Sequence, residues 1–514
     1  MPLQAITVPS PAFYGVNKSR RDMLLPPGWA TEGRNCVIDA AGRIACRKGW
    51  TNQTTTAMTG TPTVLSLHEY LQNDGTSILI AASSTKLWHS TDNGATWADK
   101  TGAITTPTGG NWQFVNFNGK VYGAQVGHAL VTKTTTGDFA TATAATGVIP
   151  ANPVCVWAAF GRLWTISSDY QTLKWSALLD ATKWATADGG GSQDLGYLWT
   201  KGTDQGLAIG AYGSRLVVFG KRHIFLFTDG SGSDRGLDPS TMYVEDTIEG
   251  IGIVSRDTVQ SIGEGDLVFL SQSGLRSIHR VAQEKATPLS DLSGNNRDYI
   301  AAAMLVSTVD PYKMRSVFSP EEGMYLLSSP DSQLTLYFDI RAPLEDGTFR
   351  MFNWQGFRPY SMCRRINGDV LFGWTGGIIG KYYGYQDNSS AYRMVYRGGF
   401  MDLGEEQNGL WKSLKRIKLI SYSVGPATAV VKWWWDFSRE PWSTTITFEG
   451  DASDQYATDE YEAAQYGGTT SQRIDYAPLA GSGQFFQLGL EMEINGAAWA
   501  IQTATMYYEP GRQA

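Results

Sequence analysis

A short unit that recurs along most of this 514-residue chain limits the folds that the chain can adopt. Each copy contains a turn with a glycine, an apolar strand, and a second apolar or aromatic strand that starts about ten residues later. Successive copies are 44, 42, 52, 52, 58 and 45 residues apart, counted between the turn glycines Gly75, Gly119, Gly161, Gly213, Gly265, Gly323 and Gly368. A period of about 40 to 50 residues with two clear strands is typical of the blades of a β-propeller.

The apolar runs within the repeat, such as "LVVFG" and "LVFLS", suit strands that are buried between two neighbouring sheets. One small twisted sheet cannot bury both of its faces, whereas blades stacked around an axis cover each other and leave only short edges exposed. Closing such a ring often borrows a strand from elsewhere in the chain, so seven countable units allow six or seven blades. We therefore expect an all-β fold built on a β-propeller.

Changes in strand length and composition divide the chain into three expected regions. Residues 1–50 form an extended, proline-containing arm that ends in a hairpin, and residues 51–394 hold the propeller repeats. Residues 395–514 contain about five longer strands with alternating apolar residues, which predicts a β-sandwich-like domain. One stretch of this last region lacks Lys and Arg and is expected to form a long exposed loop, because it concentrates Glu449, Asp451, Asp454, Asp459, Glu460 and Glu462.

The charge and hydropathy of the chain argue against two broad classes of function. A net charge of −7 with an isoelectric point near 5.4 disfavours a protein whose main task is to grip nucleic acid. The sequence has no run of 18 apolar residues and therefore predicts no membrane-spanning segment. The start "MPLQAITVPSPAF" lacks the features of a secretory signal, which predicts folding in a cytoplasm.

The four cysteines are Cys36, Cys46, Cys155 and Cys363, and none forms a C-x-x-C pair, so zinc binding is not expected. Cys36 and Cys46 flank a predicted hairpin, "CVIDAAGRIAC", and could face each other across it. Two small apolar residues that stay reduced are the simpler interpretation, and a bond between them is the alternative.

The octamer "STDNGATW" is the most distinctive local motif in the chain. It matches the Asp-box pattern S-x-D-x-G-x-T-W, with Ser90, Asp92, Gly94, Thr96 and Trp97 at the defining positions. We expect Asp92 to accept hydrogen bonds from turn amides, Gly94 to take a positive φ and Trp97 to pack beneath the turn. The motif resembles the Asp-boxes of sialidase-type propellers, which lie on blade hairpins away from the active site. It therefore predicts a structural turn.

Signatures of catalysis are missing from the sequence. The histidines stand alone, without H-E-x-x-H or H-x-H spacing: His68, His89, His128, His223 and His279. The chain has no G-x-S-x-G elbow, Walker loop or dinucleotide fingerprint. A sialidase would need clustered arginines, an acid/base carboxylate and a tyrosine, and no motif marks such a cluster. We expect no catalytic residue, no cofactor and no metal site.

Two stretches of the C-terminal region are candidate interface segments. Trp433, Trp434 and Trp435 put indoles on both faces of a predicted strand, so that one face enters the core and the other is available to a partner. Lys415 and Arg416 lie in "KSLKRIK", where the basic residues form a solvent-facing stripe or, as an alternative, contact phosphates.

Five further stretches occur in one order along the chain: "FYGVNKSRRDMLLPPGWATEGRNCVIDAAGRIACRKGW", "LKWSALLDATKWA", "RLVVFGKRHIFLFT", "LVFLSQSGLRSI" and "MYYEPGR". Together they resemble the tail nozzle proteins of short-tailed bacteriophages, also called tail tubular or packaged-DNA-stabilising proteins. The first stretch corresponds to an extended lead and a hairpin that ends in Arg-x-Gly. The second corresponds to a blade segment with the pattern Ser-Ala-Leu-x-Asp-x-Thr-x-Trp.

The resemblance implies a virion protein with a propeller body, assembled in the host cytoplasm. Six copies would form a homohexameric ring at the distal end of the tail, docked on a tail adaptor protein and carrying tail fibres or spikes. Genomic DNA would leave through the ring without sequence-specific binding. Six copies would carry 6 × (−7) = −42 formal charges, and acidic side chains along the bore would let DNA slide without adhering.

Two alternatives come from other functional classes. A glycan-binding or glycan-cleaving, sialidase-like propeller predicts convergent Arg and carboxylate groups in a pocket at the propeller axis. A monomeric scaffold or adhesin without a role in a virion predicts a single binding face.

Overall fold

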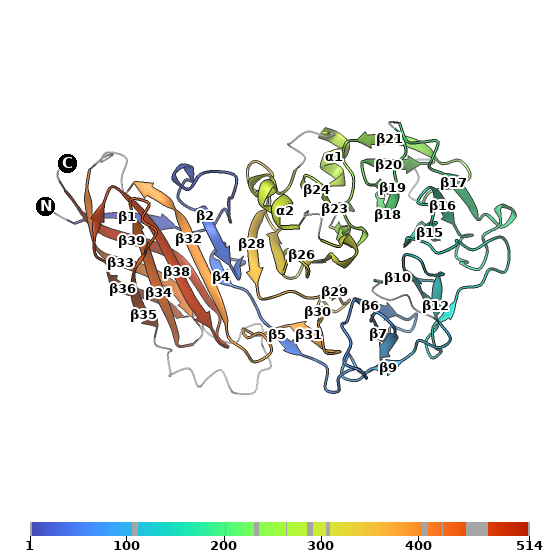
Figure 1. The fold of residues 1–514 in the computed structure, drawn as a ribbon, viewed down its shortest axis with the longest axis horizontal. Helices are drawn as coiled ribbons and strands as arrows, with labels where there is room; N and C mark the ends of the chain where they lie inside the picture. Colours follow the sequence, from blue (N-terminus) through green and yellow to red (C-terminus); the bar gives the residue numbers. More distant parts are fainter. Residues whose placement is uncertain are drawn as a thin grey trace.

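The computed structural model describes residues 3–104, 111–200, 202–230, 236–263, 265–284, 291–304, 309–402, 410–423, 425–448 and 471–511. Two β-rich lobes lie side by side, a propeller and a two-sheet domain that contains both ends of the chain (Figure 1). The acidic stretch 449–470, expected to be an exposed loop, lies outside the described residues. Among the described helices none is long and apolar enough to cross a membrane.

Seven blades of the described chain surround the propeller axis: five are separate four-stranded sheets, one is a three-stranded sheet, and the four strands of another belong to a nine-stranded sheet. Blade one contains β6 (Ser66–Leu71), β7 (Ser77–Ala82), β8 (Leu87–Ser90) and β9 (Ala98–Asp99). Blade two contains β10 (Gln113–Phe117), β11 (Lys120–Ala124), β12 (Val131–Lys133) and β13 (Ala140–Thr141). Blade three contains β14 (Cys155–Ala159), β15 (Arg162–Ile166), β16 (Thr172–Trp175) and β17 (Gly191–Asp194).

The second half of the ring follows the same plan. Blade four contains β18 (Gly206–Tyr212), β19 (Arg215–Gly220), β20 (His223–Thr228) and β21 (Tyr243–Glu249). Blade five contains β22 (Gln260–Ile262), β23 (Asp266–Ser271) and β24 (Gly274–Ser277). Blade six contains β25 (Arg315–Ser319), β26 (Met324–Ser329), β27 (Leu334–Asp339) and β28 (Arg350–Gln355). Blade seven contains β29 (Ser361–Arg364), β30 (Val370–Gly373), β31 (Ile379–Tyr382) and β5 (Trp50–Asn52).

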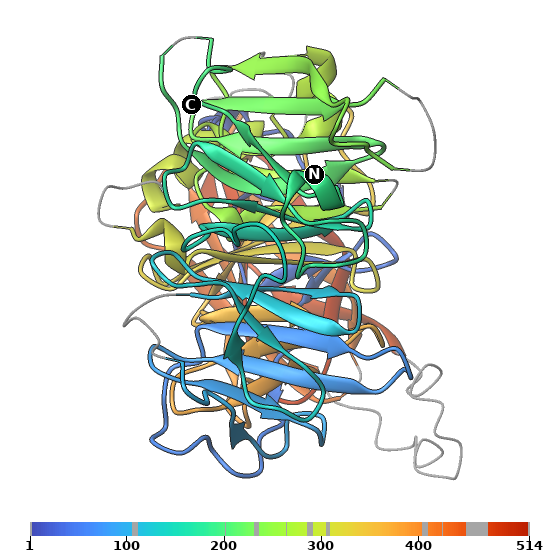
Figure 2. The ribbon, with the colours of Figure 1, turned by 90° about the vertical axis from the view of Figure 1, so that its right-hand side faces the viewer.

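The propeller expected from the repeat is confirmed. The first strand of each blade lies nearest the axis, and contacts between these strands close the ring where β29 meets β6. All seven repeat glycines lie in the turn between the first and second strands of a blade, and all have a positive φ. At Gly75 an added Cβ would meet open space, so the backbone angle is the reason for glycine there. Figure 2 views the ring from its rim, where the strands of successive blades lie one above another.

Blade five has helices after its third strand. These are α1 (Ile278–Glu284) and α2 (Arg297–Met304), and both contact β24. Buried Ile278, Val281, Ile300 and Met304 join the cores on either side of the blade. Short 3-10 helices connect other elements: η1 (Asp22–Leu24), η2 (Thr186–Asp188), η3 (Arg256–Thr258), η5 (Gly294–Asn296) and η6 (Pro311–Lys313).

The C-terminal half of the other lobe forms the two layers expected of a β-sandwich. One layer is the order β32-β38-β34-β35, from β32 (Tyr392–Asp402), β38 (Phe485–Ile494), β34 (Ala427–Trp435) and β35 (Trp442–Phe448). The other layer is built on β33 (Lys412–Ser423), β36 (Ser471–Pro478), β37 (Ser482–Gly483) and β39 (Trp499–Pro510). One large hydrophobic cluster joins the inner faces of both layers to blade six.

The N-terminal region, expected over residues 1–50 as an extended arm that ends in a hairpin, contributes strands to both lobes. Their strands are β1 (Gln4–Pro9), β2 (Ala30–Arg34), β3 (Cys36–Ile38) and β4 (Ile44–Cys46). β1 and β4 pair with β39, while β2 lies between β28 and β32 and so joins blade six and the sandwich in one nine-stranded sheet (Figure 1). β5 pairs with β31 and completes blade seven. These strands cover sheet edges that would otherwise present unpaired backbone groups.

Candidate functional site: the axial pocket and the Asp-box turn

The Asp-box turn joins β8 to β9 and centres on the Asp92 carboxylate. Asp92 Oδ1 accepts hydrogen bonds from Ser90 Oγ at 2.7 Å and from Thr96 N at 2.9 Å, and Oδ2 accepts one from Thr96 Oγ1 at 2.5 Å. Ser90 Oγ also accepts from Gly94 N at 2.8 Å. The hydrogen bond from Ser90, followed by those from Thr96, lowers the pKa of Asp92 to about 2. Gly94 has the expected positive φ of 93°.

The same turn holds the seam at which the propeller closes. Trp97 Nε1 donates to Gly94 O at 3.0 Å, and the indole packs against a core cluster shared by blades one and seven. Asn93 Oδ1 accepts a hydrogen bond from Arg365 Nη2 at 3.0 Å. Arg365, which follows β29, also forms a buried ion pair of 3.0 Å with Glu69 of β6. The turn thus connects the first blade to the last. The octamer sequence alone does not predict this connection.

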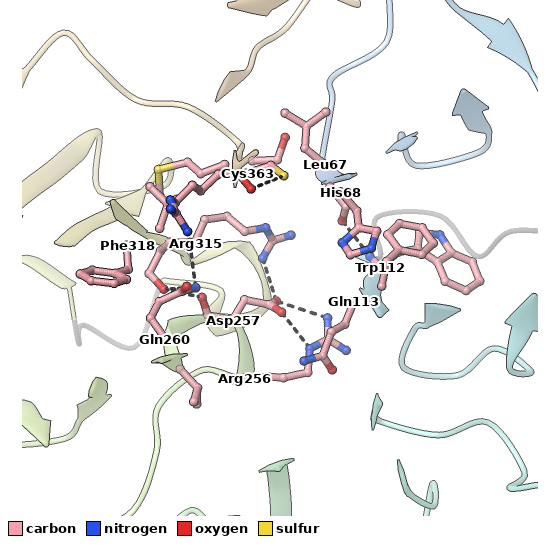
Figure 3. Close-up of a pocket in the computed structure, with 18 of the residues that line it drawn as sticks. Leu67, His68, Trp112, Gln113, Arg256, Asp257, Gln260, Arg315, Phe318 and Cys363 are labelled. Carbon is pink, nitrogen blue, oxygen red and sulfur yellow. Dashed lines mark hydrogen bonds and ion pairs between the residues drawn. The ribbon is translucent and has the colours of Figure 1, made fainter. Parts of the chain in front are cut away.

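A pocket of about 390 Å³ opens at the propeller axis (Figure 3). Its walls come from the first strands of blades one, two, three, six and seven, and from η3 and β22 of blade five. His68 lines the wall, where burial lowers its pKa and its Nε2 lies 2.9 Å from Asn116 Oδ1. The residues that line the pocket within the described chain include no tyrosine.

The Asp257 carboxylate lies between two nearly buried guanidinium groups in this pocket (Figure 3). Arg256 Nε is 3.0 Å from Asp257 Oδ1, and Arg315 Nη1 is 3.0 Å from Asp257 Oδ2. Asn111 Nδ2 donates to Asp257 Oδ2 at 2.5 Å. Arg256 is 4% exposed and Arg315 is 6% exposed. Burial lowers the pKa of Arg315 to about 10, although the charge of Asp257 opposes this shift.

The arginines use their other N–H groups on backbone carbonyls of neighbouring blades. Arg256 donates to Val154 O at 2.7 Å and to Asn111 O at 3.3 Å. Arg315 donates to Leu65 O from Nε at 3.2 Å and from Nη2 at 2.9 Å. Leu65, Asn111 and Val154 precede the first strands of blades one, two and three. The cluster therefore links five blades through guanidinium N–H groups that would otherwise be free to bind a substrate carboxylate.

The junction between the propeller and the N-terminal strands depends on Arg47. Its guanidinium is fully buried and forms two hydrogen bonds to the Asp387 carboxylate, of 2.8 and 2.6 Å. The same group lies over the Tyr392 ring, 4.1 Å from the ring centroid. Two residues later, a Cβ on Gly49 would lie 1.8 Å from Gln386 O. This contact explains in physical terms the Arg-x-Gly that ends the hairpin.

The prediction that one face of the three tryptophans is available to a partner is wrong. Trp433 is 3% exposed, Trp434 7% and Trp435 6%. Trp433 and Trp435 belong to the sandwich core, and the Arg397 guanidinium, from β32 of the same sheet, lies 4.0 Å from the centroid of the Trp434 ring. Both faces of β34 are therefore covered within the chain at the three tryptophans.

Lys415 and Arg416 are exposed, and their role at an interface stays a prediction. A bulge in the pairing of β33 with β39 lies between Leu414 and Arg416, and it brings two successive basic side chains to the surface. Lys415 Nζ lies 3.0 Å from Glu509, and Arg416 lies over the rings of Tyr476 and Tyr507.

Nothing in the sequence marked the axial cluster or the buried pair of Arg47. Asp257 and Arg315 are 58 residues apart, and Arg47 and Asp387 are 340 residues apart, so only the closed ring brings the partners together. Within the described residues no group of three or more His, Cys, Asp and Glu side chains is placed to hold a metal ion.

The class defined by this geometry is a seven-bladed β-propeller joined to a β-sandwich. Solved structures with a similar fold include YCF48 bound to a D1 peptide, with a TM-score of 0.38, 12% identity and coverage of 65% of this chain and 94% of that one. The WD40 propeller domain of Doa1 has a TM-score of 0.36 and 11% identity, over 65% of this chain and 97% of that one. The extracellular domain of BT4673 from B. thetaiotaomicron has a TM-score of 0.32 and 10% identity, over 86% of this chain and 46% of that one.

Neither a protein-family model nor a curated protein matches the chain. At these TM-scores the similar structures add nothing on function, and the propeller assignment depends on the strand pairing described above.

Proposed function

We propose that this chain is a structural virion protein that forms the nozzle ring at the distal end of a short bacteriophage tail. In this role six copies surround the exit channel, dock on the tail adaptor protein and support fibres or spikes. The propeller is a wall element of the ring and carries no catalytic residue.

The observation that carries the structural role is the state of the axial arginines. In a carboxylate-binding enzyme, guanidinium N–H groups point into the pocket and are available to bind the substrate. Here Arg256 and Arg315 bind Asp257 and the carbonyls of three other blades. Such bonds favour a rigid propeller over a site that exchanges ligands.

The motifs that resemble nozzle proteins fall on elements that shape the body of this chain. Two of them cover the hairpins β19–β20 and β23–β24, and "MYYEPGR" ends β39. The N-terminal motif supplies the strand that links blade six to the sandwich and ends at the Arg47 junction. A sheet shared by both lobes suits a wall that must stay rigid while DNA passes.

The charge of the chain supports the same role. A ring of six copies carries −42 formal charges, from 6 × (−7). An acidic channel wall repels phosphates, so DNA slides through without stable contacts. A ring whose bore is lined chiefly by Lys and Arg would contradict this part of the proposal.

One observation favours a glycan-binding or glycan-cleaving propeller as the second candidate. Such a protein needs arginine and carboxylate groups together at the axis, and Arg256, Asp257 and Arg315 meet there. The occupied guanidinium groups make this candidate the weaker one. A hydrolysis screen on sialylated and neutral glycans, with Asp257→Asn as the inactive comparison, would detect it.

The experiment that tests the nozzle proposal is electron microscopy of the purified full-length chain, alone and mixed with tail or adaptor particles. A six-fold ring with an open centre is the expected result. A second sample carries Lys415→Glu with Arg416→Glu and should form fewer rings if this patch is an interface, whereas Lys183→Glu, whose side chain is 45% exposed, should not. Chains that stay single beside the adaptor would overturn the proposal.

A further inference from the structure

Cys36 and Cys46 lie directly opposite each other across the β3–β4 hairpin. The next pair toward the hairpin's open end carries a backbone hydrogen bond, from Arg47 N to Asn35 O at 3.1 Å. Hydrogen-bonded and non-hydrogen-bonded pairs alternate in an antiparallel ladder, so the two cysteines occupy a non-hydrogen-bonded pair. Cα atoms in such a pair are about 4.5 Å apart, within the range of about 4.4 to 6.8 Å that a disulfide spans.

Both thiols face the same buried side of the hairpin and are unbonded in this structure. Cys36 Sγ donates a hydrogen bond to Val395 O at 3.3 Å, and Cys46 Sγ accepts one from Trp499 N at 3.3 Å. Burial raises the pKa of Cys46 to about 11 and raises that of Cys36 well above its usual value, with the nearby Cys46 as the second cause. The two groups are therefore close enough to interact, and they react slowly because little thiolate is present.

A pocket large enough for a small reagent lies beside one of the two cysteines. Cys46 lines a pocket of about 250 Å³ between the hairpin and blades six and seven, together with Lys48, Tyr382 and Tyr385. A water molecule occupies about 30 Å³ in the liquid, so hydrogen peroxide, which is only slightly larger, fits this pocket. Cys36 is fully buried and does not line this pocket.

We propose that Cys36 and Cys46 are an oxidation site and form a disulfide when the protein leaves a reducing compartment and meets peroxide. The Cys46 thiolate attacks one peroxide oxygen, the O–O bond breaks, and sulfenic acid forms with release of hydroxide. The Cys36 thiolate then attacks the Cys46 sulfur, the S–S bond forms and a second hydroxide leaves. The two hydroxides take the two thiol protons, so two thiols and one peroxide give one disulfide and two waters.

The bond would act at the place where the two lobes meet. β3 contacts β27 and β28 of blade six, and β4 pairs with β39 of the sandwich. A disulfide between β3 and β4 fixes the hairpin that touches both lobes. The inference concerns this chain alone and does not depend on the ring proposed above.

Peptide mapping of the full-length protein tests the proposal. Reduced protein is treated with hydrogen peroxide and blocked with iodoacetamide, beside an untreated sample. Trypsin cuts after Arg34, Arg43 and Arg47, so the bond joins the peptides 35–43 and 44–47. We expect these peptides to be joined in more than half of the treated chains, to separate on reduction, and to carry iodoacetamide in the untreated sample.

Single variants separate this bond from other oxidation. Cys46→Ser should abolish the joined peptide, whereas Cys155→Ser, at another buried cysteine, should leave it intact. Treated wild-type protein with both cysteines alkylated, or with Cys46 oxidised to sulfinic acid and Cys36 free, would overturn the proposal. The wild-type map decides the question even if a variant fails to fold.

Discussion

Replacing Asp257 by Asn should destabilise the propeller strongly without changing the shape of the side chain. The carboxylate neutralises Arg256 and Arg315, and both guanidinium groups stay charged and nearly buried in the variant. In the variant the amide oxygen of Asn still accepts a hydrogen bond from one guanidinium, but the amide nitrogen, itself a donor, faces the N–H groups of the other. Breaking a buried pair costs about 3 to 5 kcal/mol, and the 14% exposure of the Asp257 side chain moves the expected loss to about 3 kcal/mol.

Urea unfolding followed by tryptophan fluorescence measures this loss, because the midpoint multiplied by the m value gives the free energy of unfolding. Glu245→Gln is the matched control. Its partner Arg215 is 38% exposed and Glu245 is 35% exposed, so that change should cost no more than about 1 kcal/mol. Added salt should shrink the loss in the control but not in Asp257→Asn. A loss below 1 kcal/mol in Asp257→Asn, or unchanged stability with lost glycan hydrolysis, would refute the structural role of the cluster.

Two further changes test the turn and the junction. Asp92→Ala should lose about 1 kcal/mol, since Asp92 is exposed and its bonds are partly screened. The pKa of Asp92 falls from 3.8 to about 2 on folding, so the contribution of its carboxylate to stability is present above the unfolded pKa and is lost as the pH falls toward 2. The difference between the urea midpoints of wild type and variant should therefore be smaller at pH 3 than at pH 5. Equal differences at the two pH values would contradict this. Gly49→Ala should cost more than about 4 kcal/mol or prevent folding, because its Cβ would overlap Gln386 O. Gly263→Ala, with open space around its Cβ, should keep the wild-type melting temperature, and equal yields of both variants would count against the close contact at residue 49.

The sequence predicted the propeller because its period depends on local backbone geometry. A hairpin between the first two strands needs a residue with positive φ, and glycine at that place recurs in every blade. Blade number was harder to predict, because closure uses β5, a three-residue strand far from β31 in the chain. The Asp-box was equally readable, since its hydrogen bonds span only a few residues.

The features that the sequence did not predict depend on contacts between distant strands. Alternation placed Trp434 on the second face of β34, but Arg397 of β32 covers that face. The arm over residues 1–50 lacks long apolar runs, and its strands gain their partners only from β28, β32 and β39. The axial cluster joins residues from five blades, and no local pattern marks such a set.

The pairing of the earliest strands with the latest ones sets the order in which this protein can fold. Trp50 needs Tyr382 to close the ring, and β1 needs β39, whose last residue is Pro510. A growing chain lacks these partners until β31 and β39 have been made, and closing so long a loop is slow. Chains that stop early keep an open ring with bare strand edges, which favour aggregation. The closed surfaces of both lobes therefore form only after β31 and β39 have been made, however early the strands that pair with them leave the ribosome.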